Sequence, residues 1–172
     1  TIFPLGAMSM QFVAMAVLLL EQDGKLSLDD DIRKLVPEIR EYQKPITILQ
    51  LLTHTSGLRE YLTLFRLALR PDGSHYDDDA VLQMLARQKE TDFAPGDRAQ
   101  YSTSNYFLLG LVVKRAAGIP LHQFANERIF LPLGMNHTHF GDLREGVQPD
   151  HASTYDAVSG DEGKFRIDMI AM

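Results

Sequence analysis

Two long apolar stretches dominate the pattern of hydrophobic and polar positions along the chain. Apolar residues cover most of the circumference of a helix predicted over residues 7–21, so we expect this helix to lie buried at the centre. A second stretch predicts a long helix over residues 105–117. Gly118 ends it, because glycine readily adopts the left-handed conformation that closes helices. Thr47 and Asp77 are candidate N-caps of two further helices.

The remaining pattern predicts a mainly α protein. Shorter helices are expected over residues 29–35, 48–53, 60–69, 78–88 and 121–129. From residue 131 onward Gly, Pro, His and Asp dominate, which predicts loop with at most short strands. We therefore expect one helical domain over residues 1–172, with a helical bundle over 1–130 and a mostly loop-rich extension over 131–172. The chain lacks an initiator Met and stops in apolar residues, so we expect a fragment or an excised domain.

Composition and charge exclude several function classes. The net charge of −6 argues against nucleic acid, which needs a basic face. Lys and Arg are scattered, and the apolar run over residues 12–20 is too short to cross a bilayer, so no membrane partner is expected. Cysteine is absent, which excludes disulfides and thiolate metal sites. No export signal is visible, and the sequence leaves the compartment open.

Histidines in the extension raise the question of a metal site. His137 and His139 lie two residues apart, with Asp142 and His151 nearby. Two such histidines share a face only on a strand, and the usual helical spacing of four residues is absent. We therefore expect no metal and no other cofactor.

Five short blocks follow one another along the chain in an order that carries a family resemblance. They are residues 18–30, residues 46–58 with the turn His-Thr-Ser-Gly, residues 93–97, residues 101–110 and residues 132–138. Together they resemble the class C β-lactamases, D-alanyl-D-alanine carboxypeptidases and family VIII esterases, a superfamily of penicillin-binding-protein-like serine hydrolases. The resemblance implies the helical domain of that fold, with most of its β-sheet absent.

The catalytic pattern of this superfamily is not matched. Its S-x-x-K motif opens the first long helix, where Ser attacks the acyl carbon and Lys handles its proton. Ala7 and Met10 stand at these positions. By analogy with other hydrolases, loss of such a unit costs on the order of 10⁶-fold in turnover. Tyr101 matches the Tyr of the Y-x-N motif, but Thr103 stands at its Asn.

Further departures from the family pattern also replace a polar residue with a less polar one. Val13 stands where relatives often carry Thr, and Leu49 where they often carry Arg. The third block, K-T-G or H-x-G on a strand beside the oxyanion site, would follow only after residue 172. Two interpretations fit. Either the helical domain was separated from its sheet and resurfaced, which we favour, or a pseudoenzyme converted its cleft into an apolar pocket or partner surface.

The sequence therefore predicts a catalytically inactive stand-alone or engineered helical domain. Any small apolar ligand is expected at the former active site, against Ala7, Met10, Tyr101 and Thr103. His54, in the His-Thr-Ser-Gly turn, is expected to be structural.

Two alternatives stay open. A weak serine esterase or β-lactamase would use Ser9 or Ser102 with Tyr101. However, Ser9 is rotated by about 200° from the lost nucleophile on a helix, and Tyr has a pKa of about 10 without a nearby cation. The second alternative is an oligomerising or partner-binding module, because removal of the sheet would expose apolar helix faces.

Overall fold

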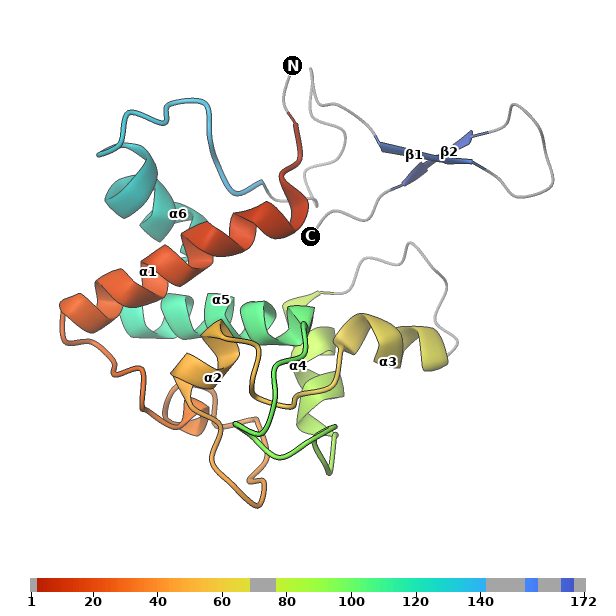
Figure 1. The fold of residues 1–172 in the computed structure, drawn as a ribbon. Helices are drawn as coiled ribbons and strands as arrows, with labels where there is room; N and C mark the ends of the chain where they lie inside the picture. The colour runs from red at the N-terminus through yellow and green to blue at the C-terminus, as the bar shows by residue number, and fades with distance from the viewer. Residues whose placement is uncertain (1–2, 69–76, 142–153, 158–164, 169–172) are drawn as a thin grey trace.

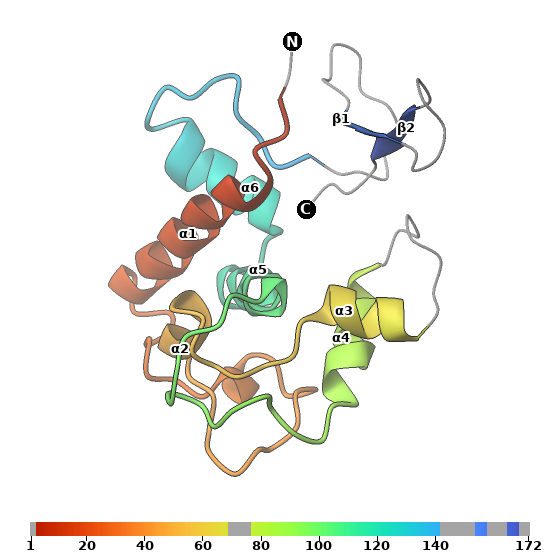
Figure 2. The same ribbon diagram turned by 45° about the vertical axis from the view of Figure 1, so that its right-hand side comes forward.

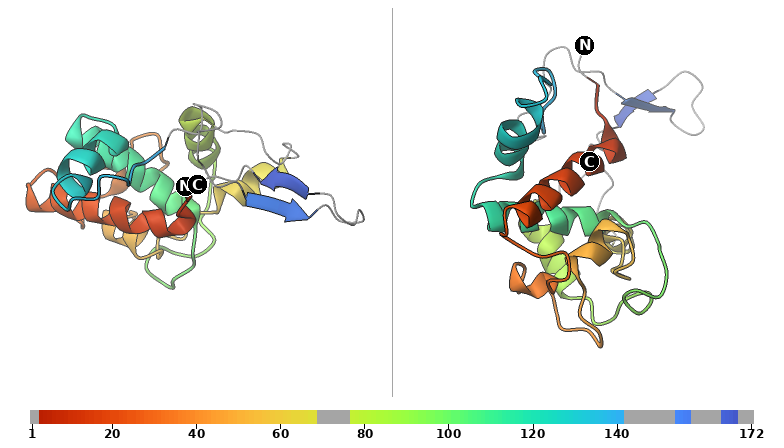
Figure 3. Two further views of the ribbon diagram at one scale, coloured as in Figure 1. Left: turned by 90° about the horizontal axis from the view of Figure 1, so that it is seen from above. Right: turned by 60° about the vertical axis from the view of Figure 1, so that its left-hand side comes forward.

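Two long helices form the centre of the molecule. The structure is a computed structural model that describes residues 3–68, 77–141, 154–157 and 165–168. Helix α1 (Met10–Gln22) packs against helix α5 (Thr103–Ala117), and both helices begin at the same end of the bundle (Figure 1). The view from above in Figure 3 shows the same arrangement. The two apolar stretches thus form the predicted helices, and the mainly α prediction is confirmed.

Helix α1 is buried on one face only. Val13, Ala16, Val17 and Leu20, at helical spacing, are its buried side chains. On the opposite face Met15 is 43% exposed and Leu18 is 45% exposed. The expectation of a helix buried all round was therefore wrong, because apolar composition does not determine which neighbours are present to cover each face.

Helix α1 also begins later than expected. Residues 6–9 form a short 3-10 helix, η1 (Gly6–Ser9), whose first residue has a φ of +54°. The glycine adopts this left-handed conformation without the Cβ clash that other residues suffer. The predicted start at residue 7 therefore falls inside the tighter turn of η1.

Shorter helices surround α5. In a view nearly along α5, helix α1 and helix α6 (Leu121–Ala125) lie on one side (Figure 2). Helices α2 (Ile48–Leu52), α3 (Tyr61–Leu67) and α4 (Asp78–Ala86) lie around its other sides. Helix α6 continues into a π-helical turn, η3 (Asn126–Phe130), and the segment predicted as a helix over 29–35 is reduced to a 3-10 turn, η2 (Ile32–Lys34).

Local capping signals explain where several helices start and end. Thr47 Oγ1 accepts a hydrogen bond from the Gln50 N–H, and Gln50 Oε1 accepts one from the Thr47 N–H, which completes a capping box for α2. Asp77 Oδ1 accepts the Ala80 N–H of α4 at 2.7 Å. Gly118, with a φ of +75°, ends α5. All three assignments match the sequence prediction.

One hydrophobic cluster joins the helices. Its largest fully buried side chains include Phe65 of α3, Phe130 of η3, Leu20 of α1 and Leu108 of α5. Outside the helices, β1 (Thr154–Ala157) pairs with β2 (Phe165–Asp168) in an antiparallel hairpin. In the described residues, extended pairing is otherwise limited to an isolated bridge between Asp31 and Thr47. The described residues therefore form a helical fold in which strand pairing is limited to one short pair and one bridge.

Candidate functional site

The start of α1 offers little chemistry. Ala7 is exposed and carries only a methyl group, and Met10 is half-buried. Ser9 Oγ donates a hydrogen bond to the Gly6 carbonyl at 2.7 Å, so its hydroxyl proton is committed to the backbone of η1. In the described part of the chain no imidazole, amine or carboxylate is bonded to this hydroxyl.

A turn between α2 and α3 faces the start of α5. His54 has a φ of +57°, which is unusual for a residue with a side chain. Its ring lies between Tyr101, at 4.9 Å between ring centroids, and Tyr106, at 5.2 Å. The backbone N–H of Ser102 donates to His54 Nδ1 at 3.3 Å, and the Gln100 N–H donates to the His54 carbonyl at 2.9 Å. His54 thus holds the segment that carries Tyr101.

A buried polar chain sets the protonation pattern of His54. The Leu58 N–H donates to Ser56 Oγ at 3.1 Å, and the Ser56 hydroxyl donates to Asn105 Oδ1 at 2.5 Å. The Asn105 amide nitrogen is consequently free to donate to His54 Nδ1, which lies 3.1 Å away. Burial lowers the pKa of His54. The expectation of a structural, hydrogen-bonded histidine agrees with this geometry.

Tyr101 is poorly suited to act as a base. Its side chain is 54% exposed and contacts the His54 ring. Partial burial raises the pKa of Tyr101, and the negative charge of Glu60 adds to the increase. Both effects favour the neutral phenol, which can donate a hydrogen bond but does not take up a proton near neutral pH.

Thr103 is bonded to Glu60 and contributes little surface. Its side chain is buried, and its hydroxyl donates to Glu60 Oε1 while its backbone N–H donates to Glu60 Oε2 at 2.6 Å. Glu60 Oε1 also accepts the Leu62 N–H at 3.2 Å, as the N-cap of α3. One carboxylate therefore accepts a backbone N–H from the first turn of α3 and another from the first turn of α5. The N-terminal ends of helices are a favourable place for negative charge.

Ser102 carries the hydroxyl between Tyr101 and Thr103. It is 4% exposed, and its Oγ makes no hydrogen bond within the described residues. A nearby serine, Ser104, donates to the Arg59 carbonyl at 2.6 Å and accepts the Tyr61 N–H at 2.9 Å. Because a nucleophile needs a base and access to substrate, neither serine is placed for attack.

The predicted site residues therefore separate into two groups. Ala7 and Met10 stand at the start of α1, while Tyr101 and Thr103 stand at the start of α5, at the same end of the bundle (Figure 1). Within the described residues, no hydrogen bond or ring contact joins the two groups. Sequence reasoning missed the role of Glu60, because the helix was predicted to begin at residue 60, whereas α3 begins at Tyr61 and Glu60 is its N-cap.

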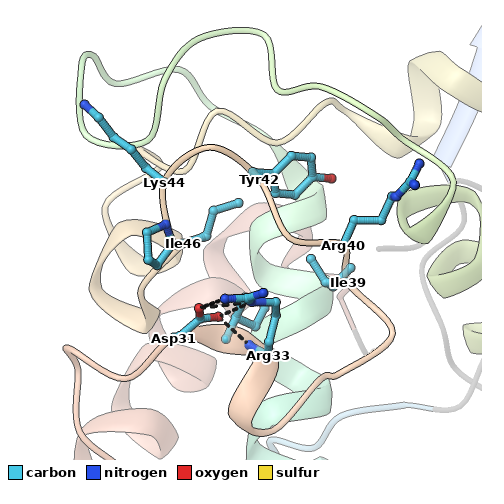
Figure 4. Close-up of a pocket in the computed structure, with 9 residues that line it drawn as sticks. Asp31, Arg33, Ile39, Arg40, Tyr42, Lys44 and Ile46 are labelled. Carbon is cyan, nitrogen blue, oxygen red and sulfur yellow. Dashed lines mark hydrogen bonds and ion pairs between the residues drawn. The ribbon is translucent and has the colours of Figure 1, made fainter.

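Two concave surfaces of the described residues lie away from the predicted site. Figure 4 shows a shallow pocket beside η2, where Asp31 and Arg33 are paired at 2.7 Å and so satisfy each other. A more open groove of about 380 Å³ runs along Arg59, Arg87 and residues 88–90. Neither includes a residue of the predicted site.

Two further kinds of feature bear on function, a metal centre and a membrane-spanning helix. Among the described residues, His, Asp and Glu side chains do not gather into a group able to hold a metal ion. Asp142 and His151 lie outside the described residues. Within the same ranges, no helix is long and apolar enough to cross a membrane.

Comparison with known proteins identifies the family. The Beta-lactamase family model matches residues 1–167. Penicillin-binding protein 4* of Bacillus subtilis (strain 168) is 31% identical over 155 residues, which cover 90% of this chain and 34% of that protein. Esterase EstB of Burkholderia gladioli is 38% identical over 148 residues, which cover 78% of this chain and 37% of that protein. The chain thus spans about a third of the length of these relatives.

Solved structures agree with this result. The octameric penicillin-binding protein homologue from Pyrococcus abyssi has a TM-score of 0.80 at 27% identity, covering 98% of this chain and 39% of that chain. EstCE1, a hydrolase with promiscuous acyltransferase activity, has a TM-score of 0.74 at 27% identity, covering 96% of this chain and 45% of that chain. Since the family model and the fold both match over nearly the whole chain, this protein belongs to the β-lactamase family of penicillin-binding-protein-like serine hydrolases.

Proposed function

We propose that this chain is a catalytically inactive, stand-alone form of the helical domain of its family. The observation that carries the proposal is the identity of the residues at the family's nucleophile and lysine positions. Where the family resemblance places the nucleophile and its lysine, the chain has the exposed methyl of Ala7 and the half-buried thioether of Met10. Neither group attacks an acyl carbon or accepts its proton.

The neighbouring hydroxyls do not replace these functions. Ser9 donates to the Gly6 carbonyl, and Thr103 donates to Glu60. Ser102 is buried, and the raised pKa of Tyr101 keeps its phenol protonated. Each hydroxyl thus lacks a free base, access to solvent, or both.

A small apolar ligand is the binding partner that suits this surface. Ala7 and Met10 are apolar, and Tyr101, just before α5, adds an exposed aromatic ring. Thr103, in contrast, is 6% exposed and offers a ligand almost no surface. We therefore narrow the expected ligand contacts to Ala7, Met10 and Tyr101.

The test is covalent labelling together with turnover. The purified chain is incubated with a fluorescent penicillin and with a fluorophosphonate, and its intact mass is measured, while nitrocefin and p-nitrophenyl butyrate report hydrolysis. We expect no adduct and no turnover above background from protein that circular dichroism shows to be helical. An adduct mapped to Ser9 or Ser102, and lost in Ser9→Ala or Ser102→Ala, would establish the rival weak esterase or β-lactamase.

A double variant, Ala7→Ser with Met10→Lys, provides a matched control. It restores both groups of the family motif, the serine in η1 and the lysine at the first residue of α1. An adduct in this variant alone would show that the two replacements cause the inactivity. Adduct formation in the unmodified chain would contradict the proposal directly.

Self-association is a second candidate function, favoured by the outer face of α1. Met15 is 43% exposed and Leu18 is 45% exposed, and their spacing of three residues places them on one face of α1. We propose a second copy of this chain as the occupant of that face. Light scattering is expected to give a mass that rises with concentration and falls to the monomer in Met15→Glu with Leu18→Glu. A constant monomer mass would exclude self-association.

A further inference from the structure

His54 is held in a conformation that its own backbone disfavours. Among the described residues it is the one non-glycine residue with a positive φ. A left-handed residue with a side chain persists only where surrounding contacts determine it. Here the contacts are two flanking tyrosine rings and hydrogen bonds at both the carbonyl and the imidazole. They tie the turn to a segment almost fifty residues later in the chain.

The hydrogen bonds of the ring depend on a neutral Nδ1. The Ser102 backbone N–H is a donor in every protonation state of the protein, so Nδ1 must accept from it. The Asn105 amide nitrogen, oriented by Ser56, approaches the same lone pair. A proton on Nδ1 would face two donors and would have no acceptor there.

The surroundings offer little compensation for a charged ring. Among the described residues, the ionisable groups facing His54 are Tyr101 just before α5, Tyr106 on α5 and Glu60 at the start of α3. The two tyrosines are neutral near pH 7. The charge of Glu60 favours the imidazolium, but its carboxylate is hydrogen-bonded to Thr103 and Leu62. Burial outweighs it and lowers the pKa of His54.

We propose that His54 is a proton-operated latch on the Tyr101 segment. With a neutral ring, it holds residues 100–105 against the turn and so fixes the exposed face of Tyr101. Protonation at Nδ1 breaks the bond from Ser102 and turns the Asn105 contact repulsive, which releases Tyr101 and the first turn of α5. The ligand surface of the proposed function would therefore exist at neutral pH and loosen in acid, but the latch itself does not depend on that function.

The direction in which stability changes with pH follows from the difference between the folded-state and unfolded-state pKa of His54. A folded-state pKa below the ordinary value of 6.5 means that the unfolded chain binds the proton more readily. The contribution of His54 to stability is therefore fully present above pH 6.5. It is lost as the pH falls from 6.5 through the lowered folded-state pKa.

The test is a pH titration by nuclear magnetic resonance from about pH 7.5 to about pH 5. We expect the Ser102 backbone amide, the Asn105 side-chain amide and the His54 ring proton to shift together with one midpoint below 6.5. In His54→Asn these shifts should vanish, because Asn tolerates a positive φ and offers an oxygen acceptor that does not titrate. His122→Asn, which removes an exposed histidine on α6, should titrate like the parent chain.

Two outcomes would overturn the latch. One is an unchanged titration of the Ser102 amide in His54→Asn, and the other is a His54 midpoint in the parent chain at or above 6.5. The second measurement remains decisive if His54→Asn does not fold. Hydrolysis enters neither readout, so activity found in the labelling experiment would leave the latch intact, and failure of the latch would leave the inactive site intact.

Discussion

Gly57→Ala is expected to be the most damaging single-methyl change in the turn that holds the site. Gly57 has a φ of +75°, and an added Cβ would overlap the Phe93 carbonyl oxygen and lie 3.2 Å from Thr91 Cβ. The oxygen belongs to backbone, so it cannot rotate away as a flexible side chain would. The Asp92 N–H donates to the Gly57 carbonyl at 2.8 Å, which leaves the two segments little freedom to separate.

The decrease in the free energy of unfolding of Gly57→Ala is the sum of two destabilising effects and one stabilising effect. Left-handed strain for alanine is about 1–2 kcal/mol, and the shift needed to relieve the overlap adds about 1–3 kcal/mol. Lower entropy of the unfolded chain offsets about 0.4–1 kcal/mol. The net loss is therefore about 1–4.6 kcal/mol, a large fraction of the roughly 5–15 kcal/mol that typically stabilises a domain.

Urea unfolding followed by circular dichroism measures this loss. With a slope of about 2 kcal/mol per molar urea, the midpoint of Gly57→Ala should fall by about 0.5–2.3 M. Gly24→Ala is the matched control, because Gly24 has a similar φ of +69° but nothing within 4 Å of an added Cβ. It should lose only the strain, a net cost of about 0–1.6 kcal/mol. Equal midpoints for the two variants would refute the overlap argument.

Three further changes test the surrounding contacts. Glu60→Ala removes the acceptor of both Thr103 bonds and the cap of α3, so the free energy of unfolding should fall by about 2–4 kcal/mol; a loss below about 0.5 kcal/mol would contradict the shared-cap interpretation. Ser102→Ala removes a buried hydroxyl that lacks a partner in the described residues, so urea unfolding should show no loss or a gain of up to about 1 kcal/mol. Hydrogen bonding to Arg33 lowers the pKa of Asp31, so its contribution to stability should be present above the ordinary value of 3.8 and be lost as the pH falls below it. Acid unfolding of Asp31→Asn, which lacks this titration, should be displaced from that of the parent chain.

The sequence could predict the residues of the site better than their geometry. The blocks around Tyr101 and the start of α1 identify the positions, because the family pattern is read directly along the chain. That Thr103 turns to Glu60, however, depends on two residues 43 positions apart. The same holds for His54 and Asn105, which are separated by 51 positions. No periodicity along the chain indicates these two pairings, because they form only when elements far apart in the sequence pack against each other.

The sequence by itself determined most of the helices and the ends that carry a local capping signal. Thr47, Asp77 and Gly118 were identifiable because capping is a contact between neighbours in the chain, or a backbone preference of one residue. Only the tertiary structure decided which faces are covered. The outer face of α1 carries the apolar Met15 and Leu18 beside Gln11 and Gln22, and Leu18 is 45% exposed while the equally apolar Val17 is fully buried. Burial depends on the elements that pack against a helix, and hydropathy along the helix records none of them.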